Sequence, residues 1–74
     1  MRDDITARNE KGYDEMVSLL GRYGFRPKNG SDYWVKDDDK VELIKDKNTI
    51  KVIKLDEEIR SGLEYIAETE ARSF

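Results

Sequence analysis

The sequence predicts an α+β fold in the order α-β-β-β-α, with a three-stranded antiparallel meander and two helices packed on one face. Two observations predict it. Residues 33–36, 41–45 and 50–55 are short runs of β-type residues, and turn-forming residues separate them. Apolar residues recur at helical spacing before and after these runs. The chain of 74 residues is expected to form a single domain over residues 1–74.

The first element is a helix that follows a short polar segment. Residues 1–8 contain few apolar side chains, and we expect a flexible lead-in there. Asn9 suits the N-cap of a helix that runs to about Tyr23. Gly24 ends this helix in the left-handed conformation, with the apolar Phe25 after it. The apolar side chains recur at the spacing of one buried stripe: Tyr13, Met16, Val17, Leu20 and Tyr23.

Alternation along the three β-type runs assigns their side chains to two faces. One set is almost entirely apolar and is expected to face the helices: Tyr33, Val35, Val41, Leu43, Ile50 and Val52. The other set mixes apolar and charged residues and is expected to be open: Trp34, Lys36, Glu42, Ile44, Lys51 and Ile53. This assignment requires an odd loop in the first hairpin, Asp38-Asp39-Lys40, and an even loop in the second, Lys47-Asn48. It pairs Lys36 with Glu42 and Trp34 with Ile44.

The last element is a second amphipathic helix. Asp56 suits its N-cap, and acidic residues in its first turn complement the positive end of the helix dipole. Its inner stripe consists of Ile59, Leu63, Ile66 and Ala67. Three glutamates, Glu57, Glu64 and Glu68, share its outer face.

The composition excludes several functional classes. The chain contains no cysteine and no histidine, so disulfides, thiolate zinc sites, catalytic triads and histidine metal ligation are absent. We therefore expect no enzyme activity, no cofactor and no metal. No apolar run approaches the length of a signal peptide or a membrane span, so we expect a cytoplasmic protein that does not contact the membrane.

Charge favours one kind of partner. Charged residues make up 42% of the chain, yet the formal net charge is only -3. The pI of about 4.9 argues against general affinity for nucleic acid, which needs a basic footprint. A protein partner with a basic surface is favoured instead.

One segment resembles a known family. The sequence LLGRYGF at residues 19–25, followed by GSD at residues 30–32, resembles the HicA-type toxins, small mRNA interferases with the fold of double-stranded-RNA-binding domains. In that family a helix ends in Gly-Phe, and a Gly-Ser-His follows at the first strand. The resemblance covers about the first half of the chain and implies RNA binding and ribonuclease activity. The family's catalytic histidine position is Asp32 here.

The phosphate-binding positions of that fold carry the opposite charge in this chain. Double-stranded-RNA-binding domains contact phosphates through the loop between the first two strands and a lysine-rich start of the second helix. Here the loop holds Asp37, Asp38 and Asp39, which we call the aspartate triplet, and the helix starts with Asp56, Glu57 and Glu58. We expect this surface to repel a phosphate backbone.

Two groups of residues are candidate partner-binding sites. The aspartate triplet has three interpretations: a solvated loop, a mimic of nucleic-acid phosphates, or a weak cation site that lacks the pattern of an EF-hand. Trp34, Ile44 and Ile53 have three as well: a protein contact site, a face covered by the N-terminal segment or by the C-terminal tail with Phe74, or a homodimer interface that Trp34→Ala would disrupt. The candidate residues together are Asp37, Asp38, Asp39, Trp34, Ile44, Ile53, Glu57, Glu64 and Glu68.

From these features we expect a small acidic protein that is not an enzyme and that occludes the basic nucleic-acid-binding surface of another protein. Phage-encoded and mobile-element inhibitors such as the anti-CRISPR proteins are similar in size and charge. Two alternatives remain: a divergent HicA-like RNA binder or ribonuclease, and a homodimeric interaction module.

Overall fold

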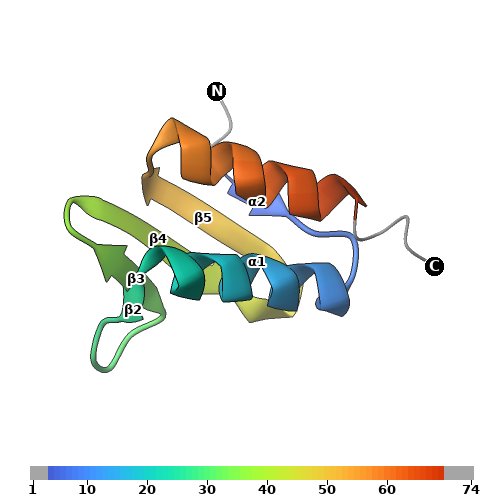
Figure 1. The fold of residues 1–74 in the computed structure, drawn as a ribbon. Helices are drawn as coiled ribbons and strands as arrows, with labels where there is room; N and C mark the ends of the chain where they lie inside the picture. The colour runs from blue at the N-terminus through green and yellow to red at the C-terminus, as the bar shows by residue number, and fades with distance from the viewer. Residues whose placement is uncertain (1–3, 70–74) are drawn as a thin grey trace.

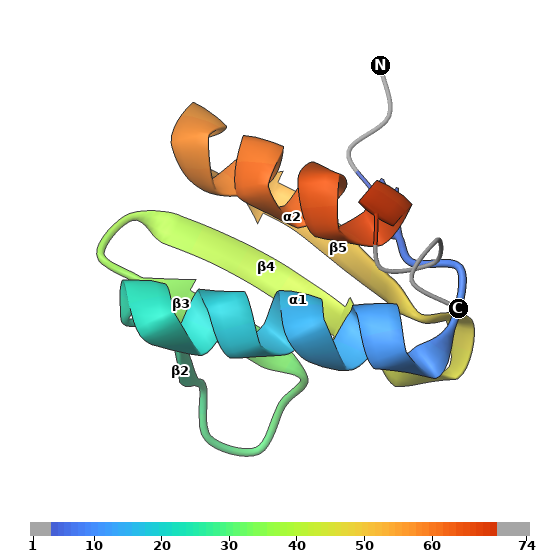
Figure 2. The ribbon, with the colours of Figure 1, turned by 45° about the vertical axis from the view of Figure 1, so that its right-hand side comes forward.

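The structure is a computed structural model that describes residues 4–69 of the 74. The elements are β1 (Asp4–Thr6), α1 (Glu10–Tyr23), β2 (Arg26–Pro27), β3 (Tyr33–Lys36), β4 (Asp39–Ile44), the 3-10 turn η1 (Lys45–Lys47), β5 (Thr49–Lys54) and α2 (Glu57–Thr69). The strands form one five-stranded antiparallel sheet in the order β1-β5-β4-β3-β2. Both helices lie on the same face of this sheet (Figure 1). Helix α1 runs along β3 and β4, and α2 runs along β5 (Figure 2). The α+β class and the two helices agree with the sequence prediction.

The predicted meander is the centre of the sheet, and a short strand extends it at each edge. The expectation of a flexible lead-in is wrong for residues 4–7, whereas residues 1–3 lie outside the described part of the chain. Ile5 pairs with Ile50 and is only 4% exposed. The Ala7 amide donates a hydrogen bond of 2.8 Å to the carbonyl oxygen of Asn48. This short segment has little intrinsic preference for a strand. It forms one here because it buries Ile5 and gives hydrogen-bond partners to backbone groups at the edge of β5.

Both ends of α1 follow the predicted capping. The Gly12 amide donates to the side-chain oxygen of Asn9 at 2.8 Å. Gly24 adopts φ of 103°, and its amide donates to the carbonyl oxygen of Gly21. The Phe25 amide donates to the carbonyl oxygen of Leu20 at 3.0 Å, which completes a Schellman-type ending. The chain therefore reverses after Gly24 and enters the sheet at β2.

The first hairpin differs from the prediction in its register. Lys36 lies opposite Asp39, so the turn consists of two residues, Asp37 and Asp38, instead of three. Asp37 makes this turn possible because it adopts the left-handed conformation, with φ of 52°. A one-residue change in register moves every side chain of a strand to the opposite face. Trp34 therefore lies opposite Val41 on the helix-covered face.

The second hairpin has the predicted parity. Ile44 lies opposite Thr49, so four residues connect β4 and β5, an even number but longer than the predicted Lys47-Asn48 loop. The helix-covered face accordingly carries the predicted residues of these two strands: Val41, Leu43, Ile50 and Val52.

The core lies between this face and the two helices. The most deeply buried side chains are Met16, Leu20, Ile50, Leu63 and Val41. Helix α2 presents the predicted inner stripe to this core. The two helices approach closely at Gly62, where an added Cβ atom would lie 2.9 Å from the Leu19 Cδ2 atom. One face of the sheet is thus covered by the helices and the core, and the other face is open.

Candidate functional site

The aspartate triplet lies beside the start of α2. A hollow of about 470 Å³ is lined by all three aspartates together with Asp56. Asp37, Asp38 and Asp56 are exposed, and Asp39 is half-buried. The turn lies there because β3 ends and β4 begins at the same end of the sheet at which β5 ends and leads into α2. We call this region, Asp37, Asp38, Asp39 and Asp56, the acidic end.

Two lysines also line this hollow. The Lys36 Nζ atom lies 5.7 Å from the centroid of the Tyr23 ring, so a cation–π contact holds its charge toward the end of α1. Lys54 is exposed and lies opposite Lys40. Four carboxylates therefore share the hollow with two ammonium groups. Within residues 4–69 no group of three acidic side chains is arranged to hold a metal ion, so the geometry gives no support to a cation site.

The predicted glutamates on the outer face of α2 are all exposed: Glu57, Glu64 and Glu68. Glu57 lies in the first turn, next to the acidic end. Glu64 and Glu68 lie further along and line a second hollow of about 330 Å³ together with β1. The carboxylates of α2 therefore extend from the acidic end to the β1 edge of the sheet.

Trp34 is separated from Ile44 and Ile53, which corrects the predicted contact site. Trp34 packs against the core from the helix-covered face. Ile44 and Ile53 belong to the open face, where Ile53 is 50% exposed. The cause is the two-residue turn, which reverses the faces of β3. Of the two predicted covering segments, the N-terminal one forms β1 and pairs with β5 in the sheet, and the C-terminal tail with Phe74 lies outside the described residues.

The open face instead carries Tyr33 and Val35 beside those isoleucines. Tyr33 lies opposite Glu42, and the Lys40 Nζ atom lies 4.3 Å from the centroid of its ring. Glu42 lies in turn opposite Lys51. Sequence reasoning missed Tyr33 here because the turn length decides the face, and an Asp-Asp pair is a weak signal for a two-residue turn. The open face is thus a mixed surface with local pairing of opposite charges.

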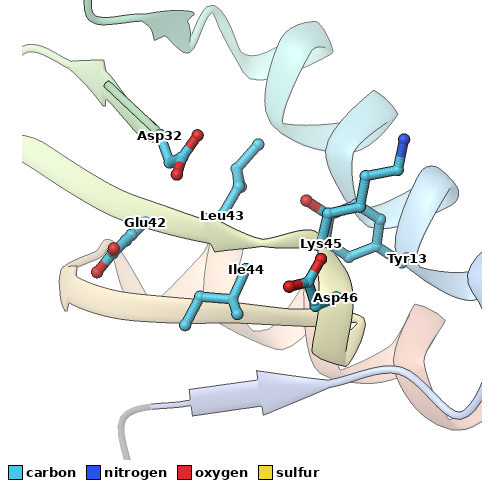
Figure 3. Close-up of a pocket in the computed structure, with 7 residues that line it drawn as sticks. All are labelled: Tyr13, Asp32, Glu42, Leu43, Ile44, Lys45 and Asp46. Atoms are coloured by element: carbon cyan, nitrogen blue, oxygen red, sulfur yellow. The ribbon is translucent and has the colours of Figure 1, made fainter. Parts of the chain in front are cut away.

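A third hollow, of about 580 Å³, lies between α1 and the end of β4. Figure 3 shows Tyr13 reaching toward it from α1, with Asp32 on the opposite side and Glu42, Lys45 and Asp46 around it. Burial raises the pKa of the Tyr13 phenol, and the nearby carboxylates of Asp14 and Asp32 raise it further. The phenol therefore stays protonated at neutral pH. It can donate a hydrogen bond but is no ready base or nucleophile.

Asp32, the residue at the histidine position of the Gly-Ser-His motif discussed above, lines this hollow. The Leu43 amide donates a hydrogen bond of 2.9 Å to the Asp32 carbonyl oxygen, which fixes the backbone at this position. Next to it, the Ser31 hydroxyl donates to the carbonyl oxygen of Lys28 and accepts from the Tyr33 amide. Gly-Ser-Asp is therefore an ordered entry into β3 that directs residue 32 to the surface.

No helix within residues 4–69 is long and apolar enough to cross a membrane. No protein-family model, curated protein or solved structure matches the chain.

Proposed function

We propose that this chain is a protein-binding inhibitor without enzymatic activity, which occludes the basic nucleic-acid-binding surface of a partner protein. The observation that supports the proposal most is the acidic end, where the aspartate triplet and Asp56 surround one hollow and the exposed glutamates of α2 continue the negative surface.

The mechanism is electrostatic attraction followed by local burial. Clustered exposed carboxylates speed the approach of a basic surface, and this attraction extends over about 8 Å at physiological ionic strength. Leu55, which is half-buried and lines the same hollow, supplies apolar atoms for the partner's side-chain stems. A phosphate backbone is repelled by the same charges, so the partner's groove and not its nucleic acid is the target.

Two variants with equal net charge test this proposal. Asp37→Asn/Asp38→Asn removes two charges from the acidic end, and asparagine tolerates the left-handed conformation of residue 37. Asp14→Asn/Asp46→Asn removes two exposed charges elsewhere. We expect nuclease-treated lysate of the host to yield a nucleic-acid-binding protein with the wild type and with the Asp14/Asp46 variant, but not with the Asp37/Asp38 variant. Equal capture by both variants contradicts the proposal.

A second candidate function is RNA binding of the HicA-like kind. The observation that favours it is the position of Asp32 in one hollow with the Tyr13 phenol and the Lys45 ammonium, two donors that a nucleotide could use. An RNA binder would bind RNA more tightly after Asp37→Asn/Asp38→Asn, because two repulsive charges are lost. An inhibitor of a basic protein would lose its partner instead. Cleavage of a single-stranded RNA by the Asp32→His variant would favour the ribonuclease alternative.

The homodimer alternative uses the open face. Ile53 is the residue to change, because Trp34 packs on the core and its loss would disturb the fold itself. A dimer through this face has a mass that depends on concentration in sedimentation and becomes monomeric in Ile53→Glu.

A further inference from the structure

The outer edge of β1 has backbone groups that no strand within residues 4–69 pairs with. In the sheet order, β1 is the terminal strand beside β5. The Ala7 amide donates to Asn48, so the peptide groups of Ala7 point toward β5. Residues in an antiparallel strand alternate in this direction, which turns Ile5 toward β5 as well. The N–H and C=O groups of Asp4 and Thr6 therefore point away from the sheet.

A hollow lies along this edge. It has a volume of about 330 Å³ and is lined by β1 and by α2 alone, through Glu64, Ala67 and Glu68. Because β5 contributes no atom to it, the hollow lies on the side of β1 that β5 does not occupy. The outward backbone groups of β1 therefore lie beside this hollow, and α2 forms its other wall.

The charged residues that line this hollow are all acidic. Asp4, Glu64 and Glu68 are exposed, and no lysine or arginine is among the residues that line it. Asp4 has a basic neighbour on the open face, since it lies opposite Lys51. Glu64 and Glu68 project from the exposed face of α2 and are the carboxylates available to a chain in the hollow.

We propose that the β1 edge binds an extended segment of a partner protein that carries lysine or arginine at alternate positions, and that this segment adds a strand to the sheet. The backbone of the segment pairs with Asp4 and Thr6, and its cationic side chains on the helix side reach Glu64 and Glu68. A second copy of this chain is a poor occupant, because pairing of two β1 edges would bring the same carboxylates together. This surface is separate from the acidic end and goes beyond the function proposed above.

The probe for this binding mode is a short peptide of alternating lysine and valine, blocked at both ends. A control peptide has the same composition with its lysines in one block, so that its charge is equal but its alternation is lost. Isothermal titration measures affinity, and amide hydrogen exchange measures protection at Thr6. We expect the alternating peptide to bind more tightly than the block peptide and to slow exchange of the Thr6 amide, which has no partner in β5.

Two pairs of variants separate the charge contribution from the backbone contribution. Glu64→Gln/Glu68→Gln is expected to weaken binding roughly fivefold, whereas Asp37→Asn/Asp38→Asn, with the same net charge, leaves it unchanged. Thr6→Pro removes the outward amide and is expected to weaken binding about fivefold. Thr6→Val keeps that amide and serves as the control for the lost hydroxyl, which bonds the Thr49 hydroxyl at 2.9 Å.

Three results would overturn the proposal. Equal binding of the two peptides, or equal weakening by both charge variants, would mean diffuse attraction to an acidic protein. Binding without protection of the Thr6 amide would place the peptide elsewhere. A dimeric mass without peptide, lost in Thr6→Pro, would mean that a second copy occupies the edge. Loss of the acidic-end interaction alone would leave the β1 proposal standing, because the Asp37/Asp38 variant tests that surface independently.

Discussion

Replacement of Ile5 by alanine measures how much β1 contributes to the fold. Ile5 is 4% exposed and packs in the core opposite Ile50. Truncation of a buried isoleucine to alanine costs about 2–4 kcal/mol, from lost transfer free energy and the cavity that remains. A domain of 74 residues has a total stability of about 4–11 kcal/mol. A loss of about 3 kcal/mol therefore removes a large share and lowers the melting temperature by roughly 12–24 °C.

The matched control is the same substitution at Ile53. This side chain is 50% exposed on the open face, so Ile53→Ala is expected to cost about 1 kcal/mol or less. Urea unfolding followed by circular dichroism gives both free energies, and an unchanged m-value shows that the comparison is valid. Equal losses at the two positions, or no loss in Ile5→Ala, would refute the docking of β1 on the core.

Three further predictions test the caps, the register and the hollow beside α1. Gly24→Ala is expected to lower the free energy of unfolding by about 1–2 kcal/mol, because Gly24 has φ of 103°. Gly21→Ala is expected to raise it by about 1 kcal/mol, because Gly21 lies at an exposed helical position with nothing within 4 Å of an added Cβ atom. Thermal unfolding should therefore show shifts of the melting temperature of opposite sign for the two variants. Trp34→Ala should cost about 2 kcal/mol and Val35→Ala under about 1 kcal/mol in urea unfolding, an order that the opposite register would reverse. The raised pKa of Tyr13 gives stability that is complete below pH ~10 and is lost as the pH rises through the folded-state pKa, so Tyr13→Phe should flatten the alkaline fall of the melting temperature.

The helices could be predicted from the sequence because their signals are local. Asn9, Gly24 and Asp56 stand at the ends of apolar stripes, and the structure begins or ends a helix at each. The faces of β4 and β5 followed from alternation of large aliphatic residues. In each case the decisive interactions join residues a few positions apart, so the pattern itself contains the information.

The misplaced elements depend on pairings between distant residues or on one backbone angle. Segment β1 has three residues, too few for alternation to be read, and its partner strand begins at Thr49. The face of Trp34 depended on whether Asp37 enters the left-handed conformation, which aspartate adopts only in a minority of cases. That angle also changed the candidate site, because it places Trp34 against the core, on the face opposite to Ile44 and Ile53.

The pairing of β1 with β5 also affects how long the folded state lasts. Thr6 and Thr49 meet across a sequence separation of 43 residues, and closing a loop of that length costs about 3 kcal/mol in chain entropy. The central hairpins and α1 close much shorter loops, so we expect them to form before β1 docks. Interactions made after the folding barrier slow unfolding without speeding folding. The N-terminal strand is therefore expected to slow unfolding. Loss of the Ile5 side chain should leave the folding rate nearly unchanged and shorten the lifetime of the native state by about two orders of magnitude.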